Sequence, residues 1–274
     1  MTRVLSALAL LPIVIGTVWW LPPVATLALA MLFAVLAFVE YRRIAGALGA
    51  QVDAGIGGAA VILACTMMSG ILDPDVYLNA VPLGLPSMLG VLLLGSLIAA
   101  GAIAVGQGQP GPGVLANTAA TLFAPIYIGL PLGALAAVRQ VGGREAVGLL
   151  ALAIIVSDSG QYYTGRAFGR RPLAPSISPK KTVEGAIGGV VVATLAMMLV
   201  GRYVFESPLW LLALLGAAIA LLGIVGDLFE SLLKRSAGVK DSSNLIPGHG
   251  GVLDRIDSWL FAAPVYYVFV RFVA

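Results

Sequence analysis

Apolar stretches of about 20 residues recur along this 274-residue chain, and they constrain its fold more than any other feature. A helix rises about 1.5 Å per residue, so a stretch of this length crosses the hydrocarbon core of a bilayer. Hydrophobic residues make up 59% of the chain and charged residues 11%, whereas soluble domains are about half apolar and a quarter charged. The sequence therefore predicts an all-α, polytopic integral membrane protein.

Nine apolar stretches are candidates for transmembrane helices, and Pro22-Pro23 separates the first two, which could form a hairpin. We expect the first to be a retained helix rather than a signal peptide, because no convincing small-residue cleavage site follows it. The approximate limits are 4–20, 22–39, 55–72, 83–105, 114–138, 146–165, 183–205, 208–228 and 257–273.

Lysine and arginine are unevenly distributed between the two sides of such a protein. With the N-terminus inside, twelve lie on the cytoplasmic side, and four lie on the other: Arg139, Arg144, Arg202 and Arg271. Cytoplasmic loops of membrane proteins carry the excess of these residues. The pattern predicts a multi-pass protein of the cell (plasma or inner) membrane, with its N-terminus and its polar loops on the cytoplasmic face.

Charge also divides the chain into two regions. Residues 1–145 carry few charges and are predicted to form a membrane scaffold, whereas residues 146–274 carry three polar patches and are predicted to form the catalytic region. Cys65 lies inside an apolar stretch, so no disulfide framework is expected. Gly185 and Gly189 are spaced as in GxxxG, which favours close helix packing over nucleotide binding.

The first polar patch is SDSGQYYTGRAFGRR, which directly follows an apolar stretch. Asp158 is therefore predicted to lie in the membrane or at its edge, where an ionisable residue indicates a functional site. The alternative is a structural hydrogen bond to a neighbouring helix. Tyr162 and Tyr163 are typical of the aromatic belt at a membrane surface.

The second patch is SPKKTVEG. Ser178 followed by Pro179 predicts a helix N-cap and a first-turn proline, which would place Lys180 and Lys181 in the opening turn. Two cations are unfavourable at the positive end of a helix dipole, and a bound anion would resolve the conflict. We therefore expect a phosphate site, although lysines of the positive-inside rule would also explain the pattern.

The third patch combines two predicted helices. Asp254 and Asp257 in LDRIDSW are three residues apart and share a face, and so do the four polar residues of GDLFESLLKR. Carboxylates that converge repel one another unless they hold cations, and oxygen ligands suit magnesium rather than zinc. The four polar residues of GDLFESLLKR are Asp227, Glu230, Ser231 and Lys234.

A polar loop joins these two helices and contains Lys240, Asp241 and the run PGHGG. Its glycines would expose backbone N–H groups, and Lys234 and Arg255 could bind phosphate oxygens. His249 could be a general base, a phosphate ligand or a loop hydrogen bond. Acidic residues, basic residues and a glycine-rich loop together predict phosphoryl or nucleotidyl transfer with a divalent metal.

The run from Ser231 to Asp257, SLLKRSAGVKDSSNLIPGHGGVLDRID, resembles the signature of phosphatidate cytidylyltransferases, the CDP-diacylglycerol synthases. The stretches SDSGQYYTGRAFGR and SPKKTVEG are similar to other stretches of that family, so the resemblance covers roughly residues 155 to 260. One departure is Ser243, where bacterial members often have glycine, and it concerns loop flexibility more than chemistry.

The resemblance implies an enzyme that makes CDP-diacylglycerol and pyrophosphate from CTP and from phosphatidic acid of the bilayer. It implies a Mg²⁺ centre at Asp227, Asp254 and Asp257, leaves open a second, monovalent cation, and implies a homodimer with no nucleic acid partner. The remaining residues expected to bind CTP or to assist the transfer are Asp158, Ser178, Lys180, Lys181, Thr182, Lys234, Lys240, Asp241, His249 and Arg255.

Two other functions compete with this interpretation. A CTP-dependent polyprenol or phytol kinase would transfer the γ-phosphate of CTP instead of the cytidylyl group. A transporter would spread polar residues through both halves of a repeated bundle, with broken helices near the membrane midplane. Here the polar residues gather after residue 155 and the sequence shows no internal repeat, so a transporter is disfavoured.

Overall fold

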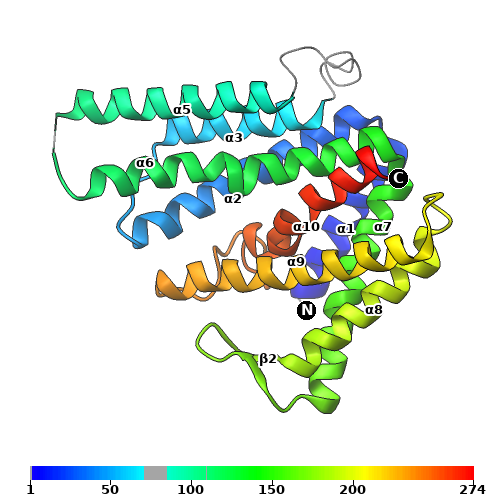
Figure 1. The fold of residues 1–274 in the computed structure, drawn as a ribbon. Coiled ribbons are helices and arrows are strands. Elements are labelled where there is room, and N and C mark those ends of the chain that lie inside the picture. Colours follow the sequence, from blue (N-terminus) through cyan, green and yellow to red (C-terminus); the bar gives the residue numbers. More distant parts are fainter. Residues whose placement is uncertain (1, 71–84, 109) are drawn as a thin grey trace. The chain divides into compact units, whose positions relative to one another are not determined.

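A computed structural model describes residues 2–70, 85–108 and 110–274 of the chain, and this part is nearly all-α, as predicted (Figure 1). One short antiparallel hairpin, β1–β2, interrupts the helices. The elements in chain order are α1 (Thr2–Trp20), α2 (Pro23–Ala47), α3 (Ala54–Ser69), α5 (Leu85–Gln107), α6 (Gly113–Ala124), the π-helical turn η1 (Pro125–Gly129), α7 (Leu130–Phe168), β1 (Pro172–Ala174), β2 (Ser178–Thr182), α8 (Val183–Gly201), α9 (Leu209–Ser236) and α10 (Leu253–Phe272).

Among the described residues, five helical segments are long and apolar enough to cross a membrane. The longest contains two of the predicted stretches, 114–138 and 146–165, and it bends between them at Gly143, whose φ is 77°. The bend falls in the gap between these two predicted stretches. The end of the predicted stretch 55–72 and the start of 83–105 lie outside the described residues. The five segments are Pro23–Ala47, Gly90–Gln107, Gly113–Phe168, Val183–Gly201 and Leu209–Ser236.

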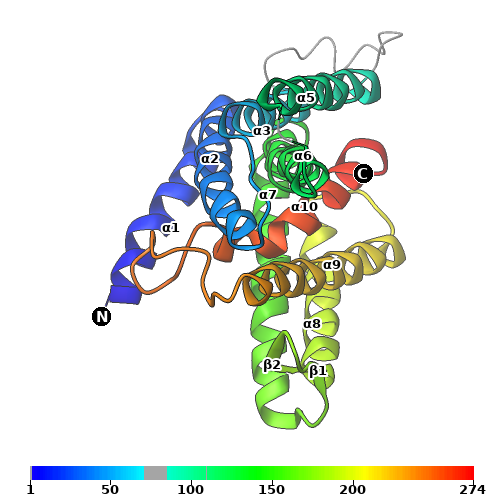
Figure 2. The same ribbon diagram turned by 90° about the vertical axis from the view of Figure 1, so that its left-hand side faces the viewer.

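The chain divides into two compact units, and the first comprises Met1–Gln140 and Ser236–Arg255. In this unit α2, α3, α5 and α6 pack on one another (Figures 1 and 2). A glycine permits the close approach of α7 to α3, because a Cβ at Gly133 of α7 would lie only 2.5 Å from the carbonyl oxygen of Cys65. Cys65 is buried and is a free thiol, as predicted.

The second unit comprises Val141–Arg235 and Ile256–Ala274. Within it α7 and α8 run side by side, and the β1–β2 hairpin joins them at one end (Figure 2). A Cβ at Gly189 would lie 2.8 Å from the carbonyl oxygen of Ser157, and a Cβ at Gly185 would lie 2.8 Å from that of Gln161. The prediction that these two glycines permit close helix packing is confirmed.

The predicted N-cap at Ser178 is wrong. Ser178 belongs to β2 and pairs with Ala174 of β1. The helix begins five residues later, and Thr182 is its N-cap, since Thr182 Oγ1 accepts a 3.1 Å hydrogen bond from the amide of Gly185. Pro179 has no N–H and suits an edge strand. The two lysines therefore precede the helix instead of occupying its opening turn.

Candidate active site

The last turns of α9 carry a polar face in the second unit, as the spacing predicted. Ser231 Oγ donates a 3.3 Å hydrogen bond to Asp227 Oδ1, and the ammonium group of Lys234 forms an ion pair with Glu230 one turn earlier. Glu230 and Lys234 are buried, whereas Asp227 and Ser231 are partly exposed. The face therefore presents Asp227 as its accessible carboxylate.

Lys181 of β2 reaches this face and forms an ion pair with Asp227 Oδ2. The side chains of Lys181 and Asp227 are 21% and 32% exposed, so water and solutes can reach both charges. The sequence placed the two residues in separate patches, and the fold brings them together. Asp227 thus lies beside a cation that an incoming phosphate group could also bind.

The polar end of α9 also lies against the first turns of α10. A Cβ at Gly226 would lie 2.5 Å from the carbonyl oxygen of Asp257, so the two helix backbones almost touch beside Asp227. Asp257 is half-buried, and its Oδ1 accepts a 2.6 Å hydrogen bond from the amide of Ser258. Within the second unit, two of the three predicted metal ligands therefore come from helices in direct contact.

Asp158 lies on α7 in the same unit, and its side chain is exposed. Gln161 Nε2 donates a 3.2 Å hydrogen bond to Asp158 Oδ1. Tyr162 and Tyr163 are also exposed and pack edge to face with their ring centroids 5.2 Å apart. Both interpretations of Asp158, a ligand-binding residue and a structural hydrogen-bonding group, remain compatible with this arrangement.

The loop between α9 and α10 belongs to the first unit. Gly248 and Gly250 have φ values of 77° and 82°, a conformation that favours glycine. Their turn is closed by a bridge between Ile246 and Gly250, and the amide of His249 donates a 2.9 Å hydrogen bond to Ile246 O. Lys240 and Asp241 are exposed residues of this loop, and Arg255 is exposed in the first turn of α10.

The carboxylate of Asp254 is oriented by this loop. Its Oδ2 accepts hydrogen bonds of 2.9 Å from the amide of Ser242, 2.8 Å from Ser242 Oγ and 2.7 Å from the amide of Gly251. A Cβ at Gly250 would lie 2.5 Å from the same oxygen. The loop therefore holds Asp254 in one orientation at the start of α10.

Glu40 is a buried residue of this region that the sequence reasoning missed. Its two carboxylate oxygens accept hydrogen bonds from the hydroxyl of Ser243 and from the amides of Val252 and Leu253, and Oε2 shares the hydroxyl of Ser242 with Asp254. The available signal was a single carboxylate at the end of an apolar helix, which indicates a functional or structural role.

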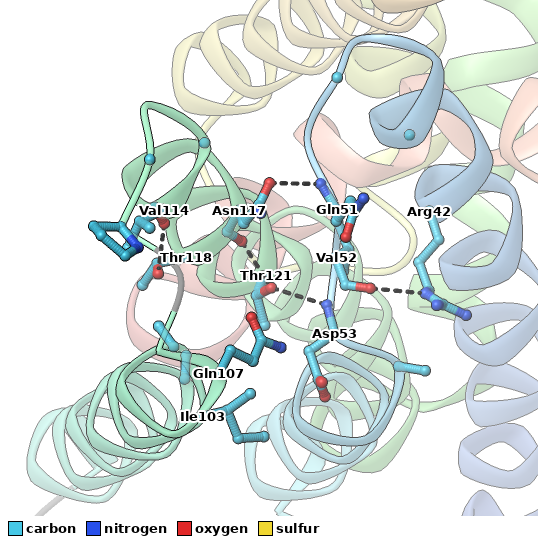
Figure 3. A pocket seen from close by; sticks show the side chains of 18 residues that line it. Arg42, Gln51, Val52, Asp53, Ile103, Gln107, Val114, Asn117, Thr118 and Thr121 are labelled. Carbon is cyan, nitrogen blue, oxygen red and sulfur yellow. Dashed lines mark hydrogen bonds between the residues drawn. The ribbon is translucent and has the colours of Figure 1, made fainter.

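The first unit also contains a pocket of about 880 Å³ at the end of the α2–α3 and α5–α6 connections (Figure 3). Asn117 accepts a 2.7 Å hydrogen bond from the amide of Gln51, and Thr121 Oγ1 accepts one of 3.1 Å from the amide of Asp53. Arg42 Nε donates to Val52 O at 3.1 Å. None of the predicted site residues lines this pocket.

The carboxylates of the second unit provide the oxygen ligands that magnesium prefers. Over the described ranges, no group of three or more His, Cys, Asp or Glu residues forms a ready metal site. Magnesium, however, is usually held by one or two protein carboxylates, while substrate phosphates and water supply the other ligands. The carboxylate of Asp227 forms an ion pair with the ammonium group of Lys181, so it already binds one cation. The metal remains a prediction.

Membrane-length helices and a carboxylate–lysine face at a helix end define a polytopic membrane protein with a site suited to charged ligands. A family model described as "Cytidylyltransferase family" matches residues 1–273, and the chain belongs to this family.

Individual relatives carry corresponding names. The chain is 50% identical over 127 residues to a phosphatidate cytidylyltransferase of Synechocystis, which covers 45% of this chain and 43% of that protein. It is 42% identical over 149 residues to that of Bacillus subtilis, covering 53% and 55%. It is 42% identical over 134 residues to the uncharacterized protein YnbB of Escherichia coli, covering 48% and 45%. The chain thus spans about half the length of the curated relatives it matches.

Proposed function

We propose that this protein is a phosphatidate cytidylyltransferase, which transfers the cytidylyl group of CTP to phosphatidic acid and thereby forms CDP-diacylglycerol for phospholipid synthesis. The observation that carries the proposal is the contact of Lys181 with Asp227 beside Asp257, in a chain of the cytidylyltransferase family. Carboxylates and a lysine in contact are the groups that a reaction between two phosphates requires.

The nucleophile is an oxygen of the phosphatidic acid phosphate. A phosphate monoester has a second pKa of about 6, so it is mostly dianionic at pH 7 and needs no general base. This oxygen forms a new bond to the α-phosphorus of CTP, and the bond between that phosphorus and the bridging oxygen to the β-phosphate breaks. The electron pair of that bond leaves with pyrophosphate, so the reaction requires no covalent enzyme intermediate.

Asp227 and Asp257 would hold a Mg²⁺ ion, with Asp254 as the third predicted ligand. When bound, Mg²⁺ supplies charge neutralisation for the reacting phosphate oxygens and the leaving group. Lys181 would bind the triphosphate, and Asp227 would then be available as a ligand of the metal. The residues proposed to bind or orient CTP beside it are Asp158, Ser178, Lys180, Thr182, Lys234, Lys240, Asp241, His249 and Arg255.

The proposal includes the membrane arrangement predicted from the sequence. Nine transmembrane helices with the N-terminus inside would bring the polar end of α9, the β1–β2 hairpin and the loop before α10 to the cytoplasmic face of the cell membrane. CTP would then enter from the cytosol and the lipid from the bilayer. Residues 1–145 would serve as scaffold and 146–274 as the catalytic region, and the enzyme would act as a homodimer.

Labelled CTP tests this function directly. The purified protein is incubated with Mg²⁺, phosphatidic acid and CTP labelled at either the α- or the γ-phosphate. We expect the α-label in the lipid product and the γ-label in pyrophosphate. Lipid that carries the γ-label would instead identify a CTP-dependent lipid kinase, and lipid without either label would overturn both functions.

A further inference from the structure

Glu40 is a carboxylate of α2 that binds a loop more than 200 positions away in the sequence. It is only 2% exposed, and both of its oxygens lie among hydrogen-bond donors. Oε1 accepts from Ser243 Oγ at 2.6 Å and from the amide of Val252 at 3.0 Å. Oε2 accepts from the amide of Leu253 at 2.8 Å and lies 3.0 Å from Ser242 Oγ, whose single proton is shared between Glu40 and Asp254. Four neutral donors thus surround the buried charge.

Two of these donors lie at the start of α10. The helix begins at Leu253, and the first amides of a helix have no partner within the helix itself. A side chain just before the helix usually accepts these hydrogen bonds. Here Glu40 accepts them from a different helix, and its negative charge also suits the positive end of the helix dipole. Glu40 thereby serves as the acceptor for the amides at the start of α10.

The loop fits closely around this carboxylate. A Cβ at Gly251 would lie 2.4 Å from Glu40 Oε1 and 2.1 Å from Ser242 Oγ. A side chain at position 251 would therefore displace either the carboxylate or the serine. The glycine of the loop is required here for the approach of Glu40.

Ser242 connects Glu40 to a predicted site residue. Its hydroxyl oxygen lies 3.0 Å from Glu40 Oε2 and 2.8 Å from Asp254 Oδ2, and its amide also donates to Asp254. Movement of Glu40 would release Ser242 and the first turn of α10, and with them the orientation of Asp254 and Arg255.

We infer that Glu40 is a positioning residue of the transferase: it fixes the loop before α10, and so orients Asp254 as a ligand of the metal and Arg255 towards the triphosphate of CTP. This inference rests on the proposed function. It assigns a specific role to a residue of the predicted scaffold region. It also explains Ser243, whose hydroxyl donates to Glu40.

The test compares Glu40→Gln with Asp53→Asn in the full-length protein. Both replace a carboxylate by an amide in the first unit. Asp53 caps α3 through a 2.7 Å hydrogen bond from the amide of Ile56, and asparagine caps equally well. The glutamine oxygen can accept only part of the hydrogen bonds that the Glu40 carboxylate accepts, because its amino group donates instead. Size-exclusion chromatography and a thermal transition in detergent establish that each variant is folded.

The decisive readout is the KM for CTP set against the KM for phosphatidic acid. A mispositioned triphosphate site should raise the KM for CTP about tenfold in Glu40→Gln, with the KM for phosphatidic acid unchanged. Asp53→Asn should match the wild type in both. A purely structural role would lower the active fraction and leave both KM values unaltered, and that result would overturn the inference. Wild-type protein without product overturns the proposed function itself.

If Glu40→Gln does not fold, milder variants test whether Glu40 positions the CTP site. Ser242→Ala removes the hydroxyl between Glu40 and Asp254, whereas Ser243→Ala removes one donor to Glu40 alone. We expect Ser242→Ala to raise the KM for CTP several-fold and Ser243→Ala to raise it less. Values equal to the wild type in both variants would show that Glu40 does not position the CTP site.

Discussion

Glu40 of the first unit and Asp227 of the second are both carboxylates that follow the apolar part of a helix, but their partners differ in kind. Glu40 is buried and bound by two hydroxyls and two backbone amides. Asp227 is partly exposed and bound by the ammonium group of Lys181 and the hydroxyl of Ser231. One carboxylate is surrounded by fixed groups, and the other by a flexible cation.

The difference indicates that Glu40 has a positioning role, whereas the partner of Asp227 can be replaced by a ligand. Two backbone amides, the hydroxyl of Ser243 and the hydroxyl that Ser242 shares with Asp254 surround the carboxylate of Glu40. Replacing that carboxylate would leave buried donors without an acceptor. The lysine at Asp227 sits on a flexible side chain and its ion pair contributes little to stability, because partly exposed pairs are weak. A ligand can therefore replace it at small cost. The comparison predicts that changes at Asp227 affect activity more than folding.

The largest effect is expected from Asp227→Asn. This substitution preserves the volume of the side chain and removes the charge that we propose to hold the metal. Loss of one such electrostatic group should lower the rate of CDP-diacylglycerol formation about 10²- to 10³-fold, while the thermal transition in detergent stays near that of the wild type. Ser231→Ala, which removes only a hydrogen bond to Asp227, serves as the control. A rate within tenfold of the wild type would contradict the role of Asp227.

The contact of α9 with α10 can be disrupted without changing any charged residue. Gly226→Ala would place a Cβ 2.5 Å from the carbonyl oxygen of Asp257, and a backbone atom cannot move aside without shifting a helix. Gly223→Ala is the matched control, because its Cβ would lie at an ordinary 3.5 Å from Ser258 Cβ. Overpacking should destabilise Gly226→Ala by about 1–3 kcal/mol, measured as a lower thermal transition, and should reduce activity. Equal transitions for the two variants would disprove the close contact.

Features that depend on nearby residues could be predicted from the sequence. The polar face of α9 was predicted because residues three and four apart share a helix face, and the structure pairs Glu230 with Lys234 and Asp227 with Ser231. The break near Gly143 was predicted from an interruption in the apolar pattern. In both cases the residues that determine the feature lie within one or two helical turns of one another.

Features that depend on distant residues could not be predicted in this way. The contact of Lys181 with Asp227 joins positions 46 residues apart, and that of Glu40 with Leu253 joins positions 213 apart. No local spacing specifies either one. The hairpin at Ser178 was missed for a related reason: Ser-Pro fits both a helix start and an edge strand, and pairing with β1 decides between them.

A smaller effect is expected when the cation beside Asp227 is removed. Lys181→Met keeps much of the aliphatic stem and deletes the ammonium group. We expect the KM for CTP to rise about tenfold, since a charge-assisted hydrogen bond to phosphate is lost, and the thermal transition to change little. Lys180→Met, at the exposed neighbouring position, should have a smaller effect. If the two lysines were equivalent, the contact with Asp227 would have no part in CTP binding.

The smallest expected effect is a change in thermal stability that distinguishes the two candidate caps of α8, Ser178 and Thr182, apart from their proposed roles in binding CTP. Thr182 Oγ1 accepts the amide of Gly185, so Thr182→Ala should destabilise the protein by about 1 kcal/mol. Thr182→Ser keeps the hydroxyl and should recover most of that loss. Ser178 lies in β2, where its side chain caps no helix, so Ser178→Ala should leave the thermal transition near that of the wild type. The reverse order would restore Ser178 as the cap and return both lysines to the first turn of the helix. There they would oppose the helix dipole, and the ion pair of Lys181 with Asp227 would need a different backbone.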